Sequence, residues 1–422
     1  MGRNPFKPVI TRGGRNPFKT TKLGMDVSVT GPQTARTRRL NPFNPQIPAR
    51  PDFFVGREPE VTEFEKFLFQ TIAGSPMNMS ITGNRGIGKT SLLVKFEELS
   101  KENNCLVIRL SNYEGNVSNI VDFTEFISTN LKQELLSRRP LEKNLEKAKE
   151  WMQSLQPQIE WKDIHFSVEK KHIIQELLRQ RLLKIWSEIQ KEYRACVILI
   201  DEAEALERIE GVLPFLREVF QRLAAEAKYM LVLAGKLNFP ERMSESFSPL
   251  NRFFPASKLN NFNGVEIKTY VEKKTKTTGV RIDEAALNLI EHESEGHPYV
   301  LVSLCYGIFD SLRDEEELMS EDVVKRALPK VHSTLEKDFF VPMYHPLSPK
   351  AKSILKAIAV NAHDEAFSFS EAVKWTKLES NCLSPYIQEL LRRGILNKPE
   401  RARYEFFHGL FLEYVKDLAR TD

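Results

Sequence analysis

The sequence predicts an α/β protein in which a parallel β-sheet domain precedes an all-helical lid and a C-terminal winged helix. Near-continuous apolar runs at 195–200 and 229–234 are typical of parallel strands covered on both faces. After residue 263 the pattern turns helical. Three helices and a strand over 350–407 then follow the order of a winged helix.

The boundaries between these patterns predict four parts. We expect a basic extended tail at 1–50, the sheet domain at 51–262, the lid at 263–340 and the winged helix at 341–422.

Individual elements follow from local periodicity. Strands are expected at 77–82, 105–111, 195–200 and 229–234, with helices at 89–103, 119–139 and 172–194. The lid should contain helices at 265–277, 283–294, 299–313 and 320–337. The last part should contain helices at 350–361, 370–376 and 384–393, a polar turn and a strand at 403–407.

Charge is distributed unevenly along the chain. Its 422 residues carry 61 basic and 57 acidic side chains, which excludes a histone-like polycation. Residues 1–50 nevertheless hold ten basic side chains and one acidic one, a net charge of +9, and the remainder carries −5. The tail is therefore the strongest candidate for contact with a polyanion.

The cysteines and the hydropathy restrict the class of protein further. The four cysteines lie far apart without a Cys-x-x-Cys spacing, so we expect small core residues and no disulfide framework or zinc site. No apolar run reaches the roughly 18 residues that span a bilayer, and the N-terminus has no signal-peptide core. We expect a cytoplasmic protein with no membrane partner.

The tail contains a short repeat. Gly-Arg-Asn-Pro-Phe-Lys occurs at 2–7 and again at 14–19, and Asn41-Pro42-Phe43 is a weaker third copy. One interpretation is a docking peptide for a protein client. The alternative is an unstructured basic tail whose repeat arose by duplication.

One motif carries a specific chemistry. The segment from 83 to 90 matches the complete phosphate-binding P-loop pattern between a predicted strand and a predicted helix. It reads Gly83, Asn84, Arg85, Gly86, Ile87, Gly88, Lys89 and Thr90, and Ser91 follows it. The glycines let backbone N–H groups surround phosphate oxygens at a helix N-terminus. Lys89 would contact the β- and γ-phosphates, and the Thr90 hydroxyl would bind Mg²⁺. The alternative is a chance glycine-rich turn.

A pair of acids follows the strand at 195–200. Asp201 would hold Mg²⁺ through water, and Glu202 would polarise the attacking water. The alternative is a helix N-cap pair. Glu204 and Glu207 are expected to be solvated acids at a helix start. The chain lacks the Asn-Lys-x-Asp motif that reads guanine, so ATP is favoured over GTP.

These motifs resemble those of the AAA+ and STAND branch of P-loop ATPases, in particular archaeal ATPases related to origin-recognition initiators. The resemblance covers about residues 41–340. It implies that Val55, Gly56 and Arg57 lie over the adenine, that Pro298 in the lid touches the base, and that Arg252 points at a γ-phosphate. It also implies slow ATP hydrolysis without a partner, and a homo-oligomer in the ATP-bound form.

The sequence departs from the initiators at two points. They carry an arginine in the lid where Gly296-His297-Pro298-Tyr299 stands, so a STAND-like switch is favoured, and His297 is expected to be a loop residue. The polar sensor is either Lys236 or Asn238. Arg252 has a second interpretation as a surface residue.

The winged helix offers four arginines to DNA, at Arg392, Arg393, Arg401 and Arg403. Its net charge from 348 onward is only +2, so contact with protein is nearly as well supported. The favoured function is an ATPase whose nucleotide state controls assembly and DNA binding. The alternatives are a nucleotide-gated signalling switch and a partner-loading or transposition-type regulator.

Overall fold

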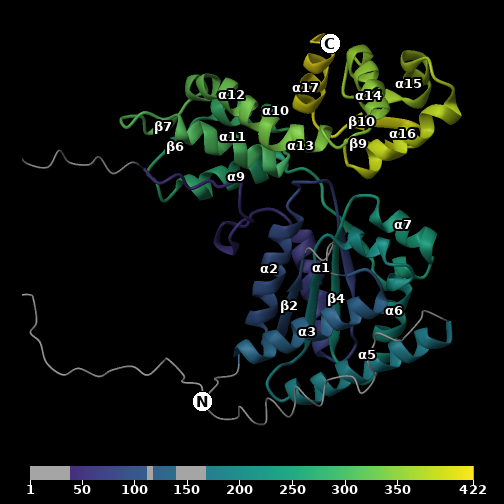
Figure 1. The fold of residues 1–422 in the computed structure, drawn as a ribbon. Helices are drawn as coiled ribbons and strands as arrows, with labels where there is room; N and C mark the ends of the chain where they lie inside the picture. The colour runs from purple at the N-terminus through teal and green to yellow at the C-terminus, as the bar shows by residue number, and fades with distance from the viewer. Residues whose placement is uncertain (1–38, 112–116, 139–167, 422) are drawn as a thin grey trace, which may run out of the picture. The chain divides into compact units, whose positions relative to one another are not determined.

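The computed structural model describes residues 39–111, 117–138 and 168–421 (Figure 1). The copies of the repeat at 2–7 and 14–19 lie outside the described residues. Within the described part of the chain, no helix is both long and apolar enough to cross a membrane.

A five-stranded parallel sheet organises the first half of the fold. Its strand order is β2-β3-β4-β1-β5, so β4 is the central strand. The strands are β1 (Met79–Thr82), β2 (Leu106–Leu110), β3 (Cys196–Ile200), β4 (Tyr229–Gly235) and β5 (Ala256–Lys258). The first four were predicted. β5 was not, because three residues with half-exposed or exposed side chains give no apolar run.

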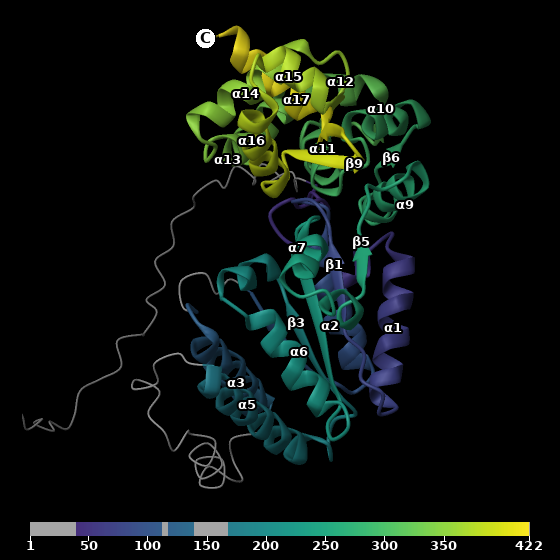
Figure 2. The same cartoon turned by 90° about the vertical axis from the view of Figure 1, so that its right-hand side faces the viewer.

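Helices cover both faces of this sheet (Figure 2). α1 (Glu58–Ile72) and α2 (Lys89–Glu102) pack on one face, and α3 (Ile120–Arg138), α5 (Val168–Ile189) and α6 (Val212–Leu223) pack on the other. Successive residues of β3 point to opposite faces, so Val197 joins the first core and Ile198 the second. Both faces are buried, which explains the uninterrupted apolar runs.

Short elements flank the strands. The 3₁₀ helix η1 (Pro51–Phe53) precedes α1, and the 3₁₀ helix η3 (Ala203–Arg208) follows β3. The helices α7 (Phe239–Ser246) and α8 (Leu250–Phe253) lie between β4 and β5.

The segment predicted to be all-helical consists of α9 (Gly264–Thr275), α10 (Glu284–Ser294), α11 (Pro298–Asp310) and α12 (Glu321–Leu335). One correction is needed. β6 (Arg281–Ile282) pairs in parallel with β7 (Leu318–Met319) between these helices. Two residues per strand are too few to show a strand period in the sequence.

The C-terminal segment has the element order expected of a winged helix. Its elements are α14 (Pro349–Asn361), β8 (Ala366–Ser368), α15 (Phe369–Thr376), α16 (Ser380–Arg392), β9 (Leu396–Glu400), β10 (Arg403–Phe406) and α17 (Gly409–Arg420). The strands form an antiparallel sheet in the order β8-β10-β9. β9 occupies the predicted polar turn, because its Asn-Lys-Pro-Glu sequence carries no apolar alternation.

A third apolar core runs through the helical and C-terminal segments together. It extends from Ile267 on α9 to Val415 on α17 and includes the π-helix η4 (Glu336–Phe340) and α13 (Val341–Tyr344), which connect the two. Phe43, from the predicted tail, is also buried in it. Cys105, Cys196 and Cys305 are buried as expected, whereas Cys382 is exposed on α16.

Candidate functional site

The predicted P-loop lies between the end of β1 and the start of α2. Gly86 and Gly88 have φ angles of 77° and 100°, in the left-handed region that glycine adopts without strain. The Gly83 amide donates to the Gly235 carbonyl at 3.3 Å, which holds the loop against the end of β4. These contacts place successive backbone amides at a helix N-terminus, as an anion site requires.

Lys89 folds back into this loop. Its ammonium donates hydrogen bonds to the carbonyls of Gly83 and Asn84, both at 2.8 Å. Burial lowers the pKa of Lys89 to about 8, and the nearby carboxylates of Glu204 and Asp201 oppose this shift. The loop carbonyls thus hold the Lys89 ammonium, which the sequence analysis predicts to bind phosphate.

The acidic pair at the end of β3 reaches the same place. The Thr90 hydroxyl donates to Asp201 Oδ2 at 2.7 Å, although β4 lies between β3 and β1, the strand that leads into the P-loop. Asp201 is buried and its other oxygen accepts the Glu202 amide at 2.9 Å. Glu202 has a φ of 52° and an exposed side chain. The structure therefore brings Lys89, Thr90, Asp201 and Glu202 together at one edge of the sheet.

Glu204 and Glu207 differ from the prediction of solvated acids. Glu204 lies 3.5 Å from the ammonium of Lys236, and Glu207 lies 2.7 Å from the guanidinium of Arg242. Each has one buried carboxylate oxygen without a hydrogen-bond partner among the described residues. Desolvation raises the pKa of Glu207, although Arg242 opposes the shift. The 3₁₀ turn of η3, which the sequence does not signal, turns both acids inward.

Of the two sensor candidates, Lys236 is the one that contacts Glu204. Asn238 is the N-cap of α7, and its side chain makes no capping hydrogen bond. The assignment of the sensor stays a prediction.

The segment before α1 is fixed to the P-loop by Arg57. Its buried guanidinium donates to the Ile87 carbonyl at 3.0 Å and to the Asn260 carbonyl at 2.7 Å. It also lies 4.8 Å from the centre of the Phe262 ring. Val55 and Gly56 precede it in the chain, with Val55 packed against the third core. Burial lowers the pKa of Arg57, and the charge is retained because a guanidinium titrates far above neutrality.

The turn before α11 also contacts the P-loop. The His297 ring nitrogen Nε2 donates to the Arg85 carbonyl at 3.0 Å, and the Tyr299 amide donates to the Gly86 carbonyl at 3.2 Å. His297 is fully buried, and desolvation lowers its pKa to about 3, so the ring is neutral. Pro298 between them is buried at the first position of α11. The sequence predicted a loop residue at 297 and gave no signal for this contact.

The remaining predicted residues make no contact with this group in the described chain. Ser91 follows Thr90 on α2, and its hydroxyl oxygen accepts the Ala49 amide at 3.0 Å. Arg252 is exposed on α8 and makes no hydrogen bond or ion pair with the P-loop in the described chain. The four arginines predicted to contact DNA, at 392, 393, 401 and 403, are exposed, and Arg393 lies 3.2 Å from Glu389.

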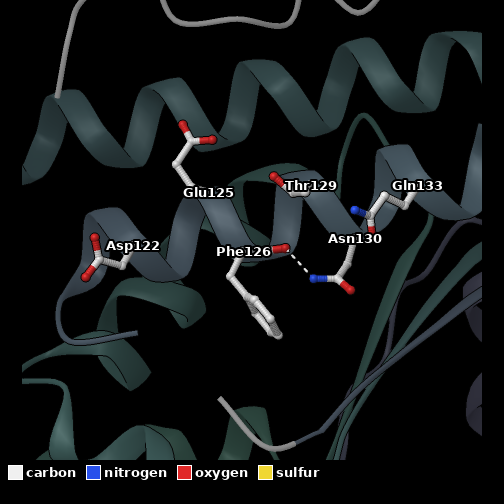
Figure 3. Close-up of a pocket in the computed structure, with 6 residues that line it drawn as sticks. All are labelled: Asp122, Glu125, Phe126, Thr129, Asn130 and Gln133. Carbon is white, nitrogen blue, oxygen red and sulfur yellow. Dashed lines mark hydrogen bonds between the residues drawn. The ribbon is translucent and has the colours of Figure 1, made fainter. Parts of the chain in front are cut away.

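A pocket of about 490 Å³ lies along α3, away from all predicted site residues (Figure 3). It is lined by Asp122, Glu125, Phe126, Thr129, Asn130 and Gln133. Glu125 already pairs with Arg181 of α5 at 2.8 Å. All lining residues belong to one helix, so this hollow adds nothing to the P-loop site.

Comparison with known families agrees with this geometry. Residues 54–233 match the family described as the AAA ATPase domain. Over these residues the chain is similar to the AAA ATPase domain. This domain spans the P-loop, the acidic pair and the sheet up to β4.

Three similar proteins extend the comparison beyond the AAA ATPase domain. An uncharacterised HTH-type transcriptional regulator of Methanocaldococcus jannaschii is 20% identical over 386 residues, covering 87% of this chain and 90% of the regulator. A Walker-type ATPase of Pyrococcus abyssi has a similar fold, with a TM-score of 0.60, 15% identity and coverage of 89% of this chain and 99% of that protein. The ORC2 protein of Aeropyrum pernix, solved in ADPNP–ADP complexes, gives a TM-score of 0.56 at 14% identity, with coverage of 88% and 98%. The predicted relationship to AAA-type ATPases of the origin-recognition kind is thereby confirmed for the fold.

Proposed function

We propose that this protein binds and hydrolyses ATP, and that its nucleotide state controls assembly and DNA binding. The observation that carries the ATPase part is the meeting of Lys89, Thr90, Asp201 and Glu202 at one sheet edge. The Thr90 hydroxyl and the Asp201 carboxylate are 2.7 Å apart. They are the hard oxygen donors that Mg²⁺ prefers, so these residues fit the ion.

Each residue then has a defined task. The P-loop amides and Lys89 bind the β- and γ-phosphates, and Thr90 and Asp201 hold Mg²⁺, which neutralises phosphate charge when bound. Glu202, exposed beside Asp201, accepts the proton of the attacking water. The water oxygen bonds to the γ-phosphorus, the bond to the bridging oxygen breaks, and ADP and phosphate leave.

The ATPase assignment predicts distinct effects for two substitutions. Lys89→Ala should weaken ATP binding about 10- to 100-fold, because a charged hydrogen-bond donor to phosphate is removed. Glu202→Gln should keep ATP affinity and lower turnover at least about 100-fold, because the proton acceptor is removed. Calorimetric titration and single-turnover hydrolysis measure the two effects. Glu210→Gln, an exposed acid just beyond η3, is the control. Wild-type turnover in Glu202→Gln would refute the role of Glu202.

Two features support DNA binding: the positive charge of the tail and the winged-helix order of elements in the C-terminal segment. The tail, residues 1–50, has a net charge of +9, whereas the rest of the chain carries −5. Arg392, Arg401 and Arg403 are exposed on the C-terminal segment. The similarity to an HTH-type regulator supports this direction.

Salt dependence distinguishes the two DNA-binding elements. Removing one contact with a DNA phosphate reduces the slope of log affinity against log salt by about 0.9. Deleting residues 1–38 should therefore reduce the slope several-fold more than Arg392→Ala combined with Arg401→Ala. Fluorescence anisotropy on a DNA duplex measures both slopes over about 50 to 200 mM salt, where such binding changes strongly. Equal slopes for the full chain and the deletion would contradict a DNA role for the tail.

A nucleotide-gated protein switch is supported by a separate observation. The turn that contacts the P-loop through His297 also contacts the start of α17: the His408 ring donates to the Ser294 carbonyl at 3.0 Å, and the Gly409 amide donates to Glu295 at 2.8 Å. A change at the P-loop can therefore reach the C-terminal segment through one turn. Nucleotide-dependent protein association without any DNA retention would favour this function.

A further inference from the structure

The third copy of the repeat occupies a site on the helical segment. The Phe43 ring is 1% exposed and packs against Tyr270 of α9 and Phe309 of α11, with ring centres 6.0 and 6.2 Å away. The Asn41 amide donates to the Tyr306 carbonyl at 2.9 Å, and Lys274 donates to the Pro42 carbonyl at 3.2 Å. The tripeptide is thus held by a pocket with both apolar and polar contacts.

Asn41 also shapes the tripeptide itself. Its side-chain oxygen accepts the Phe43 amide at 3.0 Å, an Asx turn that directs the ring into the pocket. Each residue of the tripeptide therefore has its own function. The asparagine forms the turn and one hydrogen bond to the pocket, the proline supplies a carbonyl acceptor, and the phenylalanine supplies the buried ring.

The flanking residues contribute little to this recognition. Leu40 is 88% exposed, and Asn44, which follows Phe43, is exposed as well. The pocket therefore recognises the tripeptide Asn-Pro-Phe and not the residues on either side of it. The same three residues stand at 4–6 and 16–18, so one chain carries three copies of the tripeptide.

We propose that this pocket, formed by Tyr270, Lys274, Tyr306 and Phe309, is an Asn-Pro-Phe binding site that also accepts residues 4–6 or 16–18 of a second copy of this chain. The tethered copy at 41–43 is at high effective concentration and holds the site in dilute solution. Exchange with a second chain therefore grows with protein concentration. The proposal does not depend on ATP chemistry, because none of these four residues belongs to the predicted nucleotide set.

Weakening the tethered copy should strengthen self-association. Asn41→Ala removes the Asx turn and the bond to Tyr306 in the full-length chain, which frees the pocket for Asn-Pro-Phe of another copy. Sedimentation velocity over a concentration series should show association at least about tenfold tighter than in the wild type, because two hydrogen bonds of the competing segment are removed. Adding Phe6→Ala and Phe18→Ala should abolish this increase. Asn44→Ala, an asparagine just outside the tripeptide, should behave as the wild type.

A peptide probe tests the site directly. A labelled peptide of residues 13–20 should bind full-length Asn41→Ala at least about tenfold more tightly than the wild type, and its Phe18→Ala form should not bind. Failure of the peptide to bind Asn41→Ala that has the wild-type circular dichroism spectrum would overturn the site.

A third measurement keeps the native pocket intact. A photoreactive phenylalanine at 18 in the full-length chain, mixed with isotope-labelled wild type, should cross-link to α9 or α11 of the labelled copy. If cross-links form only within the unlabelled photoreactive chain, the second copy is not the occupant. The same conclusion follows if the protein sediments as a single species at every concentration.

Discussion

At the scale of single residues, Lys89 is held by two loop carbonyls and half-buried, with a pKa near 8. Below pH 8 the ammonium is charged and available to phosphate. Above pH 8 it becomes neutral, so ATP binding must be accompanied by proton uptake.

This predicts a pH-dependent affinity for ATP. The dissociation constant should be flat from pH 7 to about pH 8 and rise up to about tenfold per pH unit above it. Calorimetric titration at about pH 7, 8 and 9 measures the change. Lys89→Arg is the control, because its guanidinium stays charged over this pH range. The affinity of this variant for ATP should not change with pH. A parallel rise in both proteins would refute the assigned cause.

Residue scale is also where sequence-based prediction of the site reached its limits. The P-loop glycines, Lys89, Thr90 and Asp201 were predicted because a local pattern between a strand and a helix signals them. The contact of His297 with Arg85 joins residues 212 positions apart, so no local period encodes it. Glu204 and Glu207 lie in a 3₁₀ turn without a sequence signal, and their partners Lys236 and Arg242 follow a later strand.

At the scale of elements, the P-loop and the turn before α11 are packed closely at Gly86. A β-carbon added at Gly86 would lie 2.8 Å from His297 Cε1 and from Tyr299 Cβ, closer than real contacts allow. At Gly88, which also has a positive φ, nothing lies within 4 Å.

The two glycines therefore form a matched pair. Gly86→Ala and Gly88→Ala should both carry backbone strain of about 1–2 kcal/mol, and Gly86→Ala should be destabilised by about 1–3 kcal/mol more through overpacking. Chemical denaturation followed by circular dichroism measures the difference in free energy of unfolding. Faster hydrogen exchange of the Tyr299 amide in Gly86→Ala alone would place the destabilisation at this contact. Equal destabilisation in both variants would contradict it.

Elements also show which parts of the fold the sequence predicts. The first four strands were predicted because burial on both faces leaves an apolar run, and α9 and α10 begin at clear N-caps, Asn263 and Asp283. β5, β6, β7, β8 and β9 were missed because each is very short or polar. Their pairing is decided by tertiary neighbours.

At the scale of the whole molecule, we expect Arg252 to contact another chain. It is exposed on α8 and makes no ion pair with the P-loop in the described chain. A group that completes a neighbouring subunit's site must be exposed in the isolated chain.

Mixing experiments test this placement. Arg252→Ala should abolish turnover and keep ATP affinity, and a mixture with Glu202→Gln should recover part of the activity, because a mixed interface can contain one intact site. Asn251→Ala, the exposed neighbour on α8, is the control for local disturbance. No recovery at concentrations where oligomers form would identify Arg252 as an ordinary surface residue.

The third apolar core has a thermodynamic consequence. The helical and C-terminal segments share it from Ile267 to Val415, whereas the two cores of the sheet contain no residue beyond Leu259. Helices that share one core are expected to melt together, and the strands of the sheet join the two cores on its faces into one unit. We therefore expect two cooperative unfolding units, with the heat absorbed on melting divided between them. ATP, bound mainly by the sheet unit, would raise the melting temperature of that unit first.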